Sequence, residues 1–111
     1  MKIVKNRTFR TKVSVELPTE AGFETVSFVG VFKALTQEEL EAAAFGTNAE
    51  QRAFISQVLI GWDGVTDDQD GSDKPYPFSP ENRDLLLQDI FIMRAVNLAY
   101  AAALSGAKRG N

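Results

Sequence analysis

The sequence changes its hydrophobic period once, near Thr36, and this change limits the possible folds more than any other feature. From Thr8 to Leu17 apolar and polar residues alternate, which is typical of a half-buried β-strand. Beyond Thr36 apolar residues recur three and four positions apart, as on one face of an amphipathic helix. Strands followed by helices in this order predict an α+β domain.

Two strands, at about residues 8–17 and 23–33, are predicted to form an antiparallel hairpin. The segment from Pro18 to Gly22 joins them, and its composition favours a turn. The second strand is apolar on both faces from Phe28 to Phe32, which predicts burial on both sides. We expect Gly30 to lie at a bulge or at a close backbone approach.

Three or four helices are predicted after the hairpin, at about residues 37–45, 48–60, 80–88 and 90–105. Thr36 and Glu39 have the spacing of a capping box, in which each side chain accepts a hydrogen bond from the other residue's backbone. Ser79 is the expected N-cap of the third helix, with Pro80 at its first position. Asp89 either begins a separate fourth helix or kinks the third.

The residue types that are missing narrow the range of functions. The chain has no Cys and no His. Thiolate nucleophiles and Cys-based zinc sites are therefore excluded, together with the commonest general base. The 111 residues suit one domain, predicted to span residues 1–111 with a basic N-terminal arm (1–7) and a flexible C-terminal tail (106–111). We expect a protein without enzymatic activity.

Residues 63–79 are predicted to form a hydrated loop that carries no chemistry of its own. Five Asp lie between residues 63 and 73, and their spacing resembles an EF-hand calcium loop when Gly71 takes the sixth position. Thr66 then occupies the first position and Pro77 the last, so both ends lack a carboxylate. Hydrated carboxylates are not expected to have the raised pKa that acid–base catalysis needs. We predict no metal site and no cofactor.

The uneven distribution of charge bears on possible partners. The formal net charge is −3, although five cations and no anion lie within residues 1–12. A basic segment is compatible with nucleic-acid binding, but Phe9 is its one aromatic residue and the whole chain is acidic. The favoured interpretation is the solvated face of an edge strand. The uncharged stretch from Ala95 to Ala107 is too short to span a bilayer. We expect neither nucleic-acid nor membrane binding, and residence in the cytoplasm.

Four apolar or aromatic residues are candidate partner-binding side chains: Trp62, Phe91, Met93 and Tyr100. Trp62 is either a core residue that packs on Tyr76 or Phe78, or a partly exposed anchor, since Trp is favoured in interface hot spots. The other three lie in the last predicted helix, most of whose apolar stripe is expected in the core. Apolar surface left over after folding is expected around these three residues, or along the open face of the hairpin.

Taken in order, several short motifs resemble the tail assembly chaperones of long-tailed bacteriophages and prophages. The resemblance runs from about residue 8 to 105 and includes the capped helix start at Thr36 and Glu39. Its most specific part is Gly61-Trp62-Asp63-Gly64-Val65, followed by Asp70-Gly71 and then Pro77-Phe78-Ser79-Pro80-Glu81-Asn82. One departure is the continuous stretch Gln88-Asp89-Ile90-Phe91, where the family pattern leads us to expect a helix breaker.

The resemblance implies a non-enzymatic role in building the phage tail. Such chaperones bind the long, largely helical tape-measure protein, keep it soluble in the host bacterial cytoplasm and help to recruit tail-tube subunits. They are usually absent from the finished particle, and a homo-oligomer is compatible with the role. The alternative is a structural virion component, such as a tail-terminator or connector subunit, which would remain in the particle.

Overall fold

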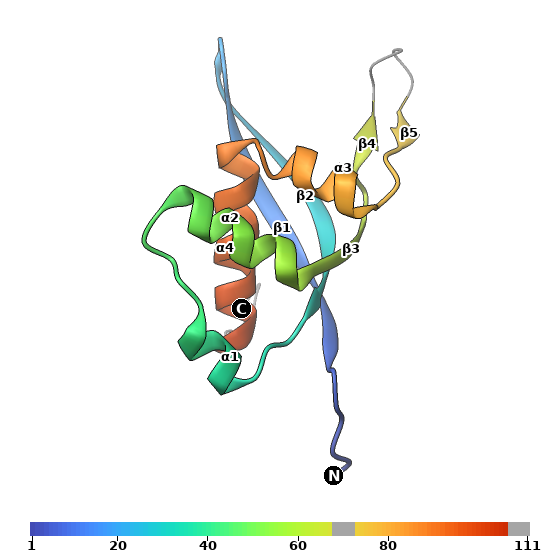
Figure 1. The fold of residues 1–111 in the computed structure, drawn as a ribbon. Coiled ribbons are helices and arrows are strands. Elements are labelled where there is room, and N and C mark those ends of the chain that lie inside the picture. Colours follow the sequence, from blue (N-terminus) through green and yellow to red (C-terminus); the bar gives the residue numbers. More distant parts are fainter. Residues whose placement is uncertain (68–72, 107–111) are drawn as a thin grey trace.

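The computed structural model describes residues 1–67 and 73–106. A three-stranded antiparallel sheet lies against a set of helices, and a small two-stranded hairpin extends beside them (Figure 1). The elements, in chain order, are β1 (Thr8–Thr19), β2 (Gly22–Lys33), α1 (Gln37–Ala42), α2 (Asn48–Val58), β3 (Leu59–Asp63), β4 (Thr66–Asp67), β5 (Lys74–Pro75), α3 (Pro80–Leu86) and α4 (Ile90–Leu104). The predicted α+β class, with its N-terminal hairpin, is confirmed.

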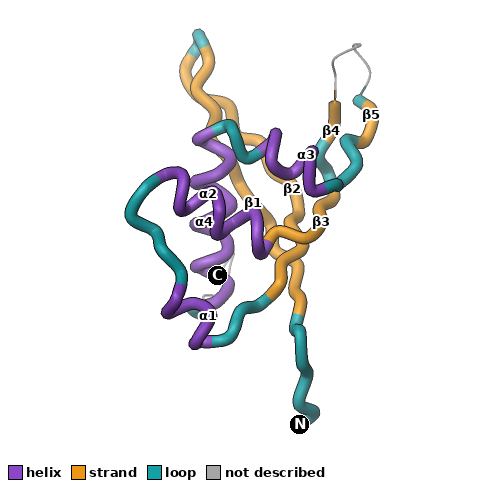
Figure 2. Tube along the Cα trace, in the orientation of Figure 1, coloured by secondary structure: helices purple, strands orange, loops and turns teal. Residues whose placement is uncertain are grey.

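The hairpin is longer than predicted. The pairing of β1 with β2 is unbroken from Thr8 opposite Lys33 to Thr19 opposite Gly22, so the connection is two residues and not five. Pro18 is part of β1 because this strand lies at the sheet edge, where a missing backbone N–H removes no hydrogen bond on the outer side. The tip of the hairpin extends beyond the helices, and the N-terminus lies at the opposite end of the molecule (Figure 2).

Strand β3 corrects the prediction for residues 48–60. We expected one helix through Ile60, but α2 ends at Val58 and the chain continues as a strand antiparallel to β2. Trp62 lies opposite Gly30 in this pairing. The apolar run from Val58 to Trp62 is short, and periodicity alone does not separate a buried strand from a helix in such a run. Backbone pairing with β2, which is distant in sequence, decides the outcome.

The helices begin where the sequence predicts, and all four end earlier. The Thr36–Glu39 capping box of α1 is present, but α1 ends at Ala42 because Ala43 adopts an extended conformation. Ser79 caps α3, which ends at Leu86. Asp89 starts a separate helix, since its carboxylate accepts hydrogen bonds from the first-turn backbone of α4. Helices α3 and α4 meet at 108°. The chain therefore has a break at the point where the sequence lacks an obvious helix breaker.

The predicted loop over residues 63–79 contains regular structure at both of its described ends. β4 and β5 pair antiparallel, with Thr66 opposite Pro75 and Asp67 opposite Lys74. Residues 68–72 and 107–111, which include Gly71 and most of the predicted C-terminal tail, lie outside the described residues. Within the described part of the chain, no single helix is long and apolar enough to cross a membrane, although the bent pair of α3 and α4 meets these criteria when taken together.

The core lies between the inner face of the sheet and helices α2 and α4. Its most deeply buried side chains are Val13, Val15, Phe32, Ile55, Val58, Leu59, Leu87, Met93, Val96 and Tyr100. Helix α4 packs on β1 and on α2. The second strand was expected to be buried on both sides, but Phe28 and Phe32 are buried whereas Val29 and Val31 are only half-buried. The sheet therefore has one core face and one partly open face.

Gly30 occupies a position in β2 where a larger residue has no room. A Cβ atom built there would lie 2.6 Å from Cε2 of Phe32 and 3.4 Å from Cδ1 of Leu59. Phe32 is fully buried and packs on Phe9 and Tyr100, so its ring has little freedom to move. Gly30 was expected at a bulge or at a close backbone approach; side chains approach it instead, and the irregularity in the pairing of β2 with β3 lies between Val31 and Phe32.

Replacing Gly30 with alanine is expected to destabilise the domain by about 1–3 kcal/mol, the usual cost of overpacking a well-filled core. Urea unfolding monitored by tryptophan fluorescence measures the loss. Gly61→Ala is the matched control in β3, because the nearest atom to its Cβ would be Val31 Cβ at a more tolerable 3.3 Å. Equal stability of the Gly30→Ala variant and the parent would contradict the prediction.

Candidate partner-binding surface

The motif around Trp62 folds into a closed aromatic cluster. Trp62 stands on β3 and is 8% exposed. Its ring stacks on Tyr76 with centroids 6.0 Å apart, and Phe78 packs edge-on at 4.8 Å. The indole Nε1–H donates to the backbone oxygen of Tyr76 at 2.8 Å, and the Tyr76 amide donates to the Val65 oxygen at 2.8 Å. The interpretation of Trp62 as a core residue packed on Tyr76 and Phe78 is therefore confirmed.

The residues on either side of this cluster fix the path of the backbone. Gly64 has a φ of +86°, a conformation that favours glycine, and it lies against the backbone of Phe28. Pro77 contributes its carbonyl oxygen, which accepts a hydrogen bond from Asn82 Nδ2 at 2.8 Å. Ser79 caps α3 through the Asn82 amide at 3.0 Å. These motif residues hold β3, the β4–β5 hairpin and α3 together, so their role in the domain is structural.

Asp63 forms an ion pair with Arg10 across the open face of the sheet. The two residues belong to β3 and β1, so the ion pair spans the central strand β2. Both side chains are more than half exposed, so the pair contributes at most about 1 kcal/mol. It partly covers the apolar outer side of β2 rather than forming a reactive centre.

The candidate residues on α4 separate into buried and exposed ones. Met93 and Tyr100 are each 1% exposed, which is not compatible with the partner-binding surface that we expected around them. Phe91 is 41% exposed. Leu98, which was not among the four candidates, is 73% exposed and lies two helical turns from Phe91 on the same side. The signal in the sequence that could have identified Leu98 is its spacing of seven residues from Phe91, which places both side chains on one side of a helix.

Helix α4 is more apolar than its packing requires. Arg94 is the one charged residue among its fifteen, so the helix has apolar residues on all sides. Such a helix is normally buried all round. Here Phe91 and Leu98 face outward instead, and with Ala101 they form an exposed apolar row that the exposed Arg94 interrupts between Phe91 and Leu98. An unburied apolar row of this kind is typical of a surface that contacts another protein.

Beside this row lies a groove between α2 and α4. A pocket of about 290 Å³ is lined by Gln51, Arg94, Asn97, Leu98 and Ala101. Its polar groups are the amides of Gln51 and Asn97, which can donate and accept hydrogen bonds, and the guanidinium of Arg94, which favours acidic partners. We name the row and this groove, comprising Gln51, Phe91, Arg94, Asn97, Leu98 and Ala101, the α2–α4 surface.

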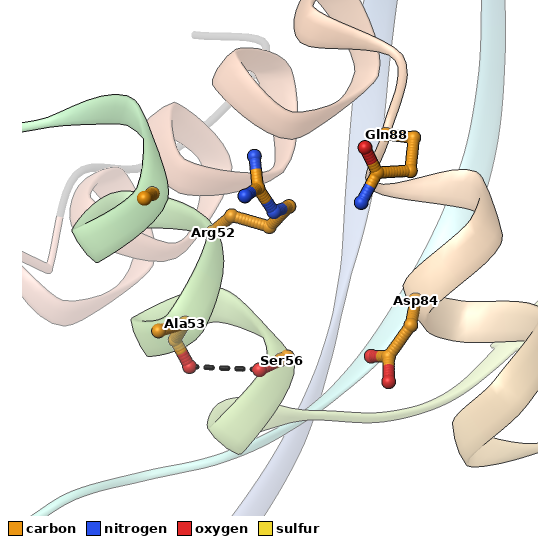
Figure 3. Close-up of a pocket in the computed structure, with 6 residues that line it drawn as sticks. Arg52, Ala53, Ser56, Asp84 and Gln88 are labelled. Carbon is orange, nitrogen blue, oxygen red and sulfur yellow. Dashed lines mark hydrogen bonds between the residues drawn. The ribbon is translucent and has the colours of Figure 1, made fainter.

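A second pocket of about 310 Å³ lies between α2 and the α3–α4 junction (Figure 3). Arg52, Asp84 and Gln88 face this space, while Ser56 donates its hydroxyl hydrogen to the Ala53 backbone oxygen at 2.8 Å. Asp84 also pairs with Arg83 at 3.0 Å. The pocket residue Arg52 follows Gln51 of the α2–α4 surface in α2, although the two pockets share no lining residue. The second pocket provides a guanidinium, a carboxylate and an amide for hydrogen bonding to a partner.

Among the residues that the structure describes, two groups have a shifted pKa, and in both cases the cause is structural. Hydrogen bonds from the Thr36 amide and hydroxyl hold the pKa of Glu39 below its usual value. Burial raises the pKa of Tyr100, whose hydroxyl bridges the Lys33 oxygen and the Leu35 amide. Neither residue lines the two pockets described above. Their shifts reflect helix capping and core packing.

The acidic residues of the chain do not gather into a metal site within residues 1–67 and 73–106, where no group of three metal-ligating side chains is found. Asp68, Asp70 and Gly71, which carried the calcium-like spacing, lie outside the described residues. Comparisons with models of protein families, with curated protein sequences and with solved structures found no match to this chain.

Proposed function

We propose that this chain is a non-catalytic chaperone of phage tail assembly that binds a helix of the tape-measure protein on its α2–α4 surface. The observation that carries the proposal is the exposed apolar row of Phe91, Leu98 and Ala101 on a helix with a single charged residue. The order of the motifs from Thr36 to Asn82, which resembles that of tail assembly chaperones, supports the choice of client.

The chemistry of the surface defines the kind of helix that fits. An amphipathic client helix would place apolar residues at i, i+3, i+4 and i+7 against Leu98 and Phe91. Arg94 lines the groove together with Leu98, so acidic side chains on the client would be favoured beside these apolar contacts. The rest of the chain is acidic, which would keep the complex soluble. Recruitment of tail-tube subunits, in the cytoplasm of the bacterial host, belongs to the same proposal.

Replacing Leu98 with aspartate is expected to weaken binding of a tape-measure helix by about thirtyfold, the effect of losing a hot spot worth about 2 kcal/mol. The domain should keep its stability, because Leu98 is 73% exposed. Co-expression with a candidate tape-measure protein, scored by the fraction of that protein that stays soluble, tests the function. Titration of a labelled client helix measures the affinity.

The matched control for Leu98→Asp is Phe23→Asp, since Phe23 is 75% exposed but lies near the hairpin tip, away from α2 and α4. Equal loss of binding in both variants would indicate nonspecific contact and would reject the α2–α4 surface. If the protein fails to keep any tape-measure protein soluble and is instead found in purified phage particles, the structural virion component becomes the better explanation.

A further inference from the structure

The N-terminal arm, residues 1–7, leaves the domain with its apolar side chains exposed. Ile3 is 88% exposed and Val4 53%. The arm is fixed at its base, where the Arg7 backbone oxygen accepts a hydrogen bond from the Ala34 amide at 2.8 Å. Three of its seven residues are cations and none is an anion. An extended segment with this composition is suited to a groove that is apolar inside and acidic at its rim.

A pocket of this character lies between the α1–α2 connection and α2. It measures about 220 Å³ and is lined by Ala43, Ala44, Glu50, Ala53, Phe54 and Gln57. The alanines leave space that a larger side chain would fill, and Phe54, itself buried, forms the apolar floor. Small-molecule sites usually measure about 300–1,000 Å³, so this pocket better suits a single aliphatic side chain.

The charges around this pocket are opposite to those of the arm. Residues 36–50 carry four glutamates and no cation, namely Glu38, Glu39, Glu41 and Glu50. Glu38 and Glu41 are exposed on α1, and Glu50 lines the pocket itself. Arm and pocket thus match in two independent respects, apolar side chain to apolar cavity and cations to carboxylates.

We propose that the N-terminal arm of one copy binds the α1–α2 pocket of a second copy of this chain, with Ile3 in the pocket and Lys2 and Lys5 near the glutamates. Within one copy the arm points away from the helices (Figure 1). Asn6, with a φ of 57°, turns the backbone at the point where the arm leaves β1. A twofold axis that places each arm on the partner's pocket makes the contact reciprocal, as in most homodimers.

Disulfide trapping tests this arrangement, because the natural chain contains no cysteine. One variant carries Val4→Cys, next to the proposed anchor, and the other carries Ala44→Cys, an exposed residue of the pocket wall. When the two are mixed under mild oxidation, covalent heterodimers should form at least tenfold faster than with Thr25→Cys. Thr25 is also exposed but lies on the hairpin. Adding Ile3→Asp to the Val4→Cys chain should remove the difference.

Two results would overturn the proposal. The first is an equal rate of cross-linking to Ala44→Cys and Thr25→Cys, which would mean that the arm has no preferred docking site. The second comes from a chain that carries both Val4→Cys and Ala44→Cys. If this chain forms mainly an internal disulfide at the same concentration at which the two single variants are mixed, and stays a monomer on a sizing column, the arm binds its own pocket and not that of a second copy.

Discussion

Replacing Tyr100 with alanine is expected to lower the free energy of unfolding by about 3–5 kcal/mol, a large part of the roughly 5–15 kcal/mol that holds a domain folded. The ring is 1% exposed and contacts three other rings, those of Phe9, Phe32 and Phe54, at centroid distances of 5.4–5.7 Å. These contacts join β1, β2, α2 and α4, so truncation leaves a cavity where the sheet meets both helices. Urea unfolding measures the loss.

The Tyr100→Phe variant separates packing from hydrogen bonding. The phenol hydroxyl donates to the Lys33 oxygen at 2.8 Å and accepts from the Leu35 amide at 3.2 Å. Removing the hydroxyl leaves both backbone groups without this partner, at a cost of about 1–3 kcal/mol. A Phe variant as stable as the parent would show that water or a shifted backbone replaces the two bonds, and that packing alone accounts for the alanine effect.

The raised pKa of Tyr100 adds a pH signature to this pair of variants. Because the pKa of the folded state lies above the ordinary value of 10.0, the stability from the neutral phenol is fully present below about pH 10. It is lost as the pH rises from the unfolded-state pKa through the folded-state pKa. The Phe variant has no proton to lose at this position. The stability gap between the parent and Tyr100→Phe should therefore narrow above pH 10, and a constant gap would contradict the assignment.

Local sequence patterns predicted the elements whose signals are local. The alternation in β1 predicted a strand, and the Thr36–Glu39 capping box predicted the start of α1. The end of α2 was wrong because Leu59 to Asp63 becomes a strand only through pairing with β2, some thirty residues earlier in the chain. No pattern within the run from Val58 to Trp62 contains that partner. Register between distant strands is decided by tertiary contact and not by propensity.

The candidate surface was predicted only in part, because it too depends on contacts between elements that are distant in sequence. The sequence predicted leftover apolar surface around Phe91, Met93 and Tyr100 or along the open face of the hairpin, but it did not indicate which side of α4 the sheet and α2 would cover. Phe91 was correctly placed outside, whereas Met93 and Tyr100 lie inside. Leu98 was missed because its exposure depends on which side of α4 is covered by β1 and α2, and these contacts join elements that are distant in sequence.

Replacing Trp62 with alanine is expected to cost about 3–5 kcal/mol, because a buried indole that contacts two rings leaves a cavity at the end of the sheet. Trp62→Phe should cost less, since it keeps an aromatic ring but removes the Nε1–H bond to the Tyr76 oxygen. The Phe variant also has a local consequence. Hydrogen exchange of the Tyr76 amide, which is bonded to Val65, should speed up by more than that of the central β2 amides.

The same Trp62→Phe variant tests whether the aromatic cluster takes part in partner binding. Trp62 is 8% exposed and its polar atom is already bonded within the chain, so it has little left to offer a partner. We therefore expect Trp62→Phe to bind the tape-measure helix within about twofold of the parent, whereas Leu98→Asp loses about thirtyfold. If a Trp62→Phe variant stays folded yet loses binding, the client binds at the β3 edge of the sheet and not on α4. That result would make Trp62 an anchor for the client. It would also show that the Trp62 side chain, buried in the free chain, becomes accessible when the client binds.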